Sequence, residues 1–187
     1  MEETAPAPDE AILLPSYWLD GALPSEDDIE DGTWIWEPDY FPEGIIRVHS
    51  HPSGKGVHFH GFRNSPIHMV GHPMITQEVW LDPADPPRGI MVKFVLTSGD
   101  EIGVYWEGEE EVFFPLIEKE GPMEIWYYGM LPELGKWTPL TILAEDLALE
   151  DQDVVGLKFV TYDGRALWGR TSVSEAPAPE ENNTPVS

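Results

Sequence analysis

The stretch Val79-Trp80-Leu81-Asp82-Pro83-Ala84-Asp85-Pro86-Pro87-Arg88 changes abruptly from apolar residues to an aspartate-proline segment. Its three prolines lack an N–H donor and fix φ, so residues 81–88 cannot form an interior strand. We expect a rigid corner that follows a strand at residues 74–81. Asp before Pro usually forms a plain turn, although Asp82 and Asp85 also offer oxygen ligands for a structural calcium ion.

Outward from this corner, 19 Pro and 17 Gly divide the chain into short segments rich in β-branched and aromatic residues. Such segments between turn residues predict strands. We expect strands at residues 33–37, 45–51, 57–62, 74–81, 89–96, 101–106, 112–117, 123–128, 137–143, 154–161 and 165–170. Only residues 144–150 favour a helical turn. This spacing predicts an all-β fold, an antiparallel two-sheet β-sandwich of the jelly-roll, galactose-binding-like type.

Composition excludes several classes of function. Ten Lys plus Arg against 35 Asp plus Glu give a net charge of −25, which disfavours nucleic acid and anionic membrane surfaces as partners. No stretch approaches the ~18 apolar residues of a membrane span, so we expect no membrane insertion. The absence of Cys excludes disulfides and thiolate ligands. Phosphate loops, nucleophile elbows and His-Glu-x-x-His are also absent, so no catalytic residue is assigned, while metal-dependent activity stays open.

Both ends of the chain alternate Pro and Ala with acidic residues, as in Ala5-Pro6-Ala7-Pro8-Asp9 and Glu175-Ala176-Pro177-Ala178-Pro179. This composition favours extended linkers over packed structure. We expect an acidic linker at residues 1–11, a β-sandwich domain at residues 12–172 and a second linker or tail at residues 173–187. A module of a longer multi-domain chain fits this layout, and a small protein with two frayed tails is the alternative.

Two further groups of residues accompany the stretch at residues 79–88. Upstream stand His49 and His58-Phe59-His60, and downstream Gly129-Met130-Leu131-Pro132-Glu133-Leu134-Gly135-Lys136-Trp137 is followed by Tyr162-Asp163-Gly164-Arg165-Ala166-Leu167-Trp168. With these motifs, the chain resembles a carbohydrate-binding-module-like β-sandwich domain that recurs in large secreted or cell-surface bacterial multi-domain proteins. The resemblance implies a non-catalytic, extracellular accessory role, with a glycan or cell-surface polysaccharide and neighbouring domains as partners. One departure is Gly169, where the pattern usually has Asp.

All six histidines lie between positions 49 and 72, at His49, His51, His58, His60, His68 and His72. Alternate residues of a strand share a face, so we expect His58 and His60 on one face. A four-residue hairpin loop at residues 53–56 would set His51 opposite His58 and His49 opposite His60. Four such imidazoles would hold a transition metal, zinc or copper. Alternatively, His49, His58 and His60 hydrogen-bond across the sandwich to buried backbone groups.

Eight Trp and six Tyr offer flat faces that stack on sugar rings, while polar neighbours bond the hydroxyls. Adjacent strand residues face opposite sides. We therefore expect one ring of Tyr105-Trp106, and at least one of Trp126-Tyr127-Tyr128, to point outward or lie at an edge. The candidate ligand-binding residues are Trp34, Trp36, Tyr105, Trp106, Trp126, Tyr127 and Tyr128. Other tryptophans, Trp80, Trp137 and Trp168, are expected in the core.

Three functions stay open on the sequence alone. The first is a non-catalytic module of an extracellular bacterial protein, for glycan binding or adhesion. The second is a metalloprotein that holds zinc or copper at His49, His51, His58 and His60. The third is a structural building block of a surface assembly. Glycan binding, metal content and concentration-dependent assembly distinguish the three.

Overall fold

The computed structural model describes residues 54–113 and 124–177, together with four short strands, β1 (Ser16–Tyr17), β2 (Glu26–Asp28), β3 (Ile35–Pro38) and β4 (Arg47–Ser50). The longer strands are β5 (Gly54–His68), β6 (Pro73–Leu81), β7 (Gly89–Leu96), β8 (Glu101–Glu107), β9 (Glu124–Met130), β10 (Thr138–Leu143), β11 (Asp153–Gly164) and β12 (Ala166–Glu175). The described helical structure is one 3₁₀ turn, η1 (Ala144–Leu147). No helix among the described residues is long and apolar enough to cross a membrane.

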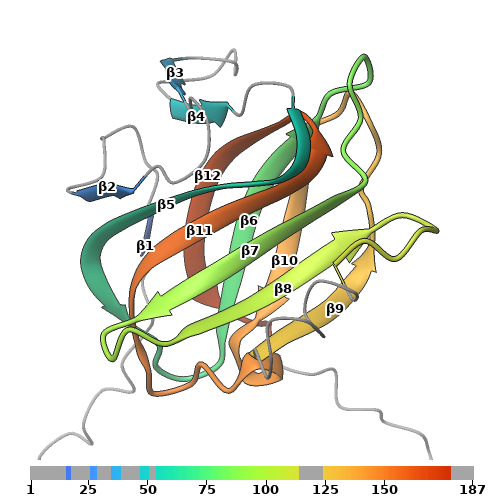
Figure 1. Cartoon of the computed structure of the whole chain (residues 1–187). Helices are drawn as coiled ribbons and strands as arrows, with labels where there is room; N and C mark the ends of the chain where they lie inside the picture. The colour runs from blue at the N-terminus through green and yellow to red at the C-terminus, as the bar shows by residue number, and fades with distance from the viewer. Residues whose placement is uncertain are drawn as a thin grey trace, which may run out of the picture.

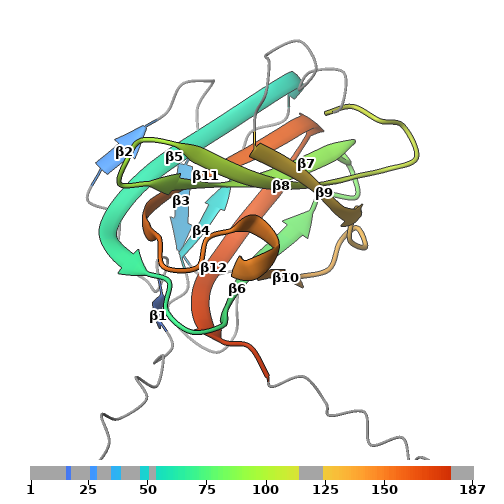
Figure 2. The ribbon, with the colours of Figure 1, turned by 90° about the horizontal axis from the view of Figure 1, so that it is seen from below.

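The described strands form two six-stranded sheets that lie one upon the other (Figures 1 and 2). Sheet A has the order β10-β6-β12-β4-β3, with β1 also pairing with β12, and sheet B has the order β2-β5-β11-β7-β8-β9. Every described pairing is antiparallel except that of β8 with β9, which is parallel. The predicted two-sheet β-sandwich is therefore confirmed, and β9 is an edge strand of sheet B.

The core lies between the sheets. In β6, alternate residues are buried, because one face of the strand packs on sheet B while the other faces outward. The largest buried side chain is Trp168 of β12, which stacks on Phe159 of β11 with ring centroids 4.6 Å apart and planes 6° apart. These two rings belong to opposite sheets, so their contact joins the two layers. Trp80 and Trp137 are half-buried.

The outer face of sheet B carries a second apolar cluster. It contains Met91, Tyr105, Val112, Phe113 and Val160, all of which are buried. Val112 and Phe113 follow β8 and lie over this face, where the Phe113 ring contacts the rings of Tyr105 and Tyr162. This cover explains why β7 is buried on both faces. A strand was expected at residues 112–117, but Val112 and Phe113 are not part of a strand. Residues 114–117 are not among the described residues.

The aspartate-proline segment forms the expected turn. Asp82 accepts a hydrogen bond from the Ala84 N–H at 2.8 Å, and its carboxylate lies 3.7 Å from the Arg165 guanidinium. Backbone hydrogen bonds from Asp82 N–H to Arg165 O and from Arg165 N–H to Asp85 O join the turn to the β11–β12 connection. The plain-turn interpretation accounts for Asp82. Calcium binding at Asp82 and Asp85 stays a prediction.

The prediction of a hairpin around residues 53–56 is wrong. β4 pairs with β3 and β12 in sheet A, whereas β5 pairs with β2 and β11 in sheet B. The chain therefore changes sheets between Ser50 and Gly54 instead of turning back on itself. The other local expectation was a helical turn at residues 144–150, and η1 occupies its first part.

Candidate functional site

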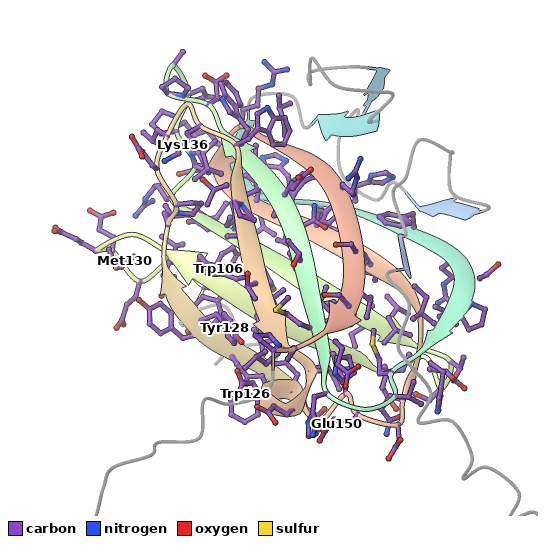
Figure 3. The ribbon with its side chains drawn as sticks, turned by 180° about the vertical axis from the view of Figure 1, so that it is seen from behind. Trp106, Trp126, Tyr128, Met130, Lys136 and Glu150 are labelled. Carbon is purple, nitrogen blue, oxygen red and sulfur yellow. The ribbon has the colours of Figure 1, made fainter. Side chains whose placement is uncertain are left out.

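Edge strand β9 presents two neighbouring aromatic side chains to solvent. Trp126 and Tyr127 are each 54% exposed, and Met130 on the same strand is 58% exposed. In the parallel ladder with β8, Trp126 pairs with Val104 and Tyr127 with Tyr105. Val104 belongs to the core between the sheets and Tyr105 to the outer cluster, so the two rings leave β9 on opposite sides. Figure 3 shows Trp126, Tyr128 and Met130 along this edge.

Tyr128 joins edge strand β9 of sheet B to sheet A through hydrogen bonds. Its hydroxyl donates a hydrogen bond to Asp146 Oδ2 at 2.7 Å and accepts one from the Leu143 N–H at 3.1 Å. Its ring meets the Trp106 ring edge-on, with centroids 5.7 Å apart. Burial raises the pKa of Tyr128, and the hydrogen bond to Asp146 raises it further against the opposing effect of the Leu143 N–H. These contacts join β9 to the end of β10 and to η1, so Trp126 extends from a fixed strand.

Tyr105 and Trp106 are both buried, at 6% exposure each. Tyr105 does point to the outer face of its sheet, as one ring of the pair was expected to do. There, however, Phe113 lies 5.7 Å and Tyr127 5.5 Å from it between ring centroids. Burial also raises the pKa of the Tyr105 hydroxyl. Neither Tyr105 nor Trp106 offers an open ring face, so the expectation that these two stack on a ligand is not met.

Glu107 holds in place the segment that covers Tyr105. Its side chain is 3% exposed, and Oε2 accepts hydrogen bonds from the N–H groups of Val112 at 2.8 Å and Phe113 at 3.0 Å. A buried carboxylate needs such donors, and these N–H groups need an acceptor. The neighbouring run Glu109-Glu110-Glu111 is exposed, as expected of a solvated turn. Glu107 was not singled out in the sequence because it stands beside this run.

Glu107→Ala is expected to lower the free energy of unfolding by about 1–3 kcal/mol, because two buried N–H groups lose their acceptor. Urea unfolding followed by tryptophan fluorescence measures the change. Glu109→Ala is the matched control, since Glu109 is exposed, and its effect should stay within about 0.5 kcal/mol. Equal losses in the two variants would contradict the clamping role of Glu107.

The rest of the outer face of sheet B carries charge on β8, β7 and β11. Glu101 lies 2.5 Å from Lys158 Nζ and 3.4 Å from Lys93 Nζ. Burial alone would raise the pKa of Glu101, but the hydrogen bond from Lys158 and the charge of Lys93 outweigh it and lower the pKa. The Lys158 ammonium also lies over the Phe59 ring, 5.7 Å from its centroid. These contacts occupy the described centre of the face, which leaves β9 as the exposed aromatic part of sheet B.

The histidines are placed in both sheets. His58 and His60 pair with Thr161 and Phe159 in an uninterrupted part of the β5–β11 ladder, so they share a face, as predicted. That face is the inner one, and His60 is fully buried. His49 lies in sheet A, where its backbone position is opposite Trp168.

The face of four imidazoles therefore does not form through a hairpin. His51 lies outside the described residues, and only the backbone of His49 is described. Metal binding by His49, His51, His58 and His60 stays a prediction.

The remaining aromatic candidates lie in the first part of the chain. Trp34 lies outside the described residues. Trp36 is in β3, where it pairs with His49 of β4, and only its backbone is described. The most exposed rings among the described candidates are therefore Trp126 and Tyr127, which follow each other along edge strand β9 and lie on its opposite sides.

Comparison with known proteins gives the fold a context. No protein-family model matches the chain, and no curated protein is similar to it. A solved structure that is similar is the family 11 carbohydrate-binding module of Clostridium thermocellum in complex with a β-1,3-1,4-mixed-linked tetrasaccharide. It is 8% identical, with a TM-score of 0.53 over 89% of this chain and 98% of the module. The fold is that of carbohydrate-binding modules.

Parts of larger enzymes also match. An exo-β-agarase is 8% identical with a TM-score of 0.50, and the match covers 89% of this chain but 26% of the agarase chain. The Endo-D glycoside hydrolase domain of Streptococcus pneumoniae R6 is 10% identical with a TM-score of 0.46, covering 80% of this chain and 21% of that one. The chain thus spans about a quarter or less of these hydrolases. At 8% identity the likeness to the agarase shows the fold alone.

Proposed function

We propose that this protein is a non-catalytic carbohydrate-binding module whose ligand stacks on the exposed rings of β9. The observation that carries the proposal is the pair Trp126 and Tyr127, each 54% exposed on a fixed edge strand. Large aromatic side chains left in water usually mark a binding surface when they gather in one place. Indole and phenol faces suit the apolar faces of sugar rings.

Polar groups lie on the Trp126 side of β9. Glu124 is exposed and lies two residues before Trp126, on the same side of β9. Asp146 is exposed next to the half-buried Tyr128. Carboxylates accept hydrogen bonds from sugar hydroxyls. A net charge of −25 repels anionic glycans, so we expect a neutral polysaccharide.

The wider setting is proposed on the same basis. We expect an extracellular accessory module of a multi-domain bacterial protein, because the expected Pro-Ala linkers accompany a fold that also occurs within a much longer agarase chain. Adhesion to a cell-surface polysaccharide would use the same rings. The structural building block of a surface assembly has no described feature in its favour over glycan binding. It is tested by light scattering over a range of protein concentrations.

Trp126→Ala and Tyr127→Ala are each expected to weaken binding to a neutral polysaccharide at least tenfold, about 1.4 kcal/mol, because each removes a stacking face. Affinity gel electrophoresis against mixed-linked β-glucan, xylan and agarose measures this. Trp126→Phe should keep part of the affinity, since it keeps an aromatic face.

The matched control is Met130→Ala, which removes an equally exposed apolar side chain of β9 without a ring face. It should bind as the native protein does. The proposal is wrong if Trp126→Ala and Tyr127→Ala retain native affinity. It is also wrong for neutral polysaccharides if the native protein binds none of the three.

A further inference from the structure

Three potential metal-binding side chains from separate parts of the chain meet at one end of the sandwich. His72 lies in the connection between β5 and β6, Glu145 in η1, and Glu150 in the turn before β11. One donor atom from each lies within 4.8 Å of the other two, and His72 Nδ1 lies 3.8 Å from Glu150 Oε1. Figure 3 shows Glu150 at this end of the molecule, away from Met130 and Lys136.

The backbone around these residues is tied together. The Met69 N–H bonds to Gln152 O at 2.9 Å and the Asp151 N–H to Met69 O at 2.7 Å, joining the β5–β6 connection to the turn that carries Glu150. The Leu149 N–H bonds to Ala144 O at 3.0 Å, which closes the segment between Glu145 and Glu150. The three side chains are therefore held at neighbouring backbone positions, while their ends stay free to rotate.

We propose that His72, Glu145 and Glu150 form a binding site for a divalent transition-metal ion, with Zn²⁺ as the best match. One imidazole nitrogen and two carboxylate oxygens are a donor set that zinc accepts, whereas calcium takes oxygen ligands. Zinc holds such ligands at about 2.0–2.2 Å, so two ligands of one ion lie no more than ~4.4 Å apart. Small rotations of exposed side chains close the present spacing of up to 4.8 Å.

The surroundings favour a cation and leave it accessible. The protein carries a net charge of −25, and Asp146 and Asp151 adjoin the two glutamates in sequence, so a bound dication relieves repulsion among carboxylates. His72 and Glu145 also line a cavity of about 380 Å³. Its other lining residues are all apolar, namely Pro73, Met74, Leu143, Ala176 and Pro177. Three protein ligands leave a fourth coordination position for water or for a donor atom of a small ligand in this cavity.

The site is distinct from the histidine set that the sequence suggested. His72 is not one of His49, His51, His58 and His60, and the nearby His68 is paired with Asp153 at 2.7 Å. None of its three ligands lies on β9, and Glu145 adjoins Asp146, which bonds Tyr128 of that strand. The two proposals rest on different side chains and are tested by different measurements, zinc binding and polysaccharide binding.

Titration of untagged, metal-free protein with ZnCl₂ by isothermal calorimetry tests the site, with the melting temperature as a second readout. We expect one Zn²⁺ per chain at this site and a higher melting temperature with zinc. His72→Ala and Glu150→Gln should each weaken this binding at least tenfold. Both side chains are exposed on turns, at 72% and 42%, so the variants should fold, which circular dichroism verifies.

Three controls make the result decisive. His68→Ala removes a neighbouring exposed histidine outside the set and should leave zinc affinity unchanged. His58→Ala reports any binding at the other histidines, and Trp126→Ala should bind zinc normally. The proposal is overturned if native protein binds no zinc, if His72→Ala binds it with native affinity, or if His68→Ala loses it equally. Tighter binding of Ca²⁺ than of Zn²⁺ at these residues would also overturn it.

Discussion

Gly156→Ala is expected to destabilise the protein by about 3 kcal/mol or more, enough to prevent folding if the native margin is small. Gly156 stands at a bulge of β11, where that strand packs against β5. A Cβ atom there would lie 2.3 Å from the carbonyl oxygen of Phe62 and 3.2 Å from the Cα of Arg63. Both are backbone atoms of β5, so relief requires the two strands to separate. Urea unfolding followed by tryptophan fluorescence measures the loss.

Gly61→Ala is the matched control on the same pair of strands. The three atoms nearest to its Cβ would all belong to the Lys158 side chain, with Cγ at 3.0 Å. A flexible lysine side chain can move away, so this variant should lose less than about 1 kcal/mol. The close approach of β5 and β11 at the bulge would be contradicted if Gly156→Ala unfolded at the same urea concentration as Gly61→Ala.

Trp168→Ala is expected to lower the free energy of unfolding by about 3–5 kcal/mol. The Trp168 side chain is fully buried, and its ring stacks on Phe159 of the opposite sheet. Its removal leaves a large cavity between the layers and ends the ring contact that joins them. Thermal and urea unfolding both report the change, and Trp168→Phe should recover part of it because a smaller ring still fills some of the space.

Trp126→Ala gives this prediction a control with the same chemical change. Because Trp126 is 54% exposed, its loss should cost less than about 1 kcal/mol of stability. The two tryptophans are therefore expected to separate folding from binding. The placement of Trp168 between the sheets would be wrong if Trp168→Ala were as stable as Trp126→Ala.

Local sequence patterns predicted most of the sandwich. The expected strands at residues 74–81 and 89–96 correspond to β6 at Pro73–Leu81 and β7 at Gly89–Leu96, because turn residues mark both ends of each. β5 is longer than expected, at Gly54–His68, and contains Pro66. Its ladder with β11 skips residues 64–66 between Arg63 and Ile67, so the strand tolerates a residue that lacks an N–H donor.

Long-range choices were not predictable from these patterns. The segment Pro52-Ser53-Gly54-Lys55-Gly56 has the residues of a hairpin turn, yet β4 and β5 join different sheets. Whether a chain turns back or crosses to the other layer depends on which partner strands bury it best. Those partners, β12 and β11, pair with residues that lie 85 or more positions earlier in the chain. The parallel pairing of β8 with β9 was not predictable for the same reason. Parallel neighbours need a crossover connection, which local turn residues do not reveal.

In the candidate sites, too, local features were predictable and long-range contacts were not. Alternation correctly required an exposed ring among Trp126, Tyr127 and Tyr128, because three consecutive residues of an edge strand cannot all be buried. Alternation also placed Tyr105 correctly on the outer face, but it could not show that the segment held by Glu107 covers this ring. His72 and Glu145 are far apart in sequence, and no spacing rule joins them.

The central claim is tested most directly by titrating ¹⁵N-labelled protein with an oligosaccharide of a neutral polysaccharide that the protein binds. The indole N–H signals in NMR spectra follow the titration. Eight tryptophans give eight candidate signals, and Trp126→Phe assigns the one that matters. We predict that the Trp126 signal and the backbone signals of β9 shift on titration, while that of the buried Trp168 does not. Shifts confined to other strands, with β9 unchanged, would contradict a carbohydrate site at this edge.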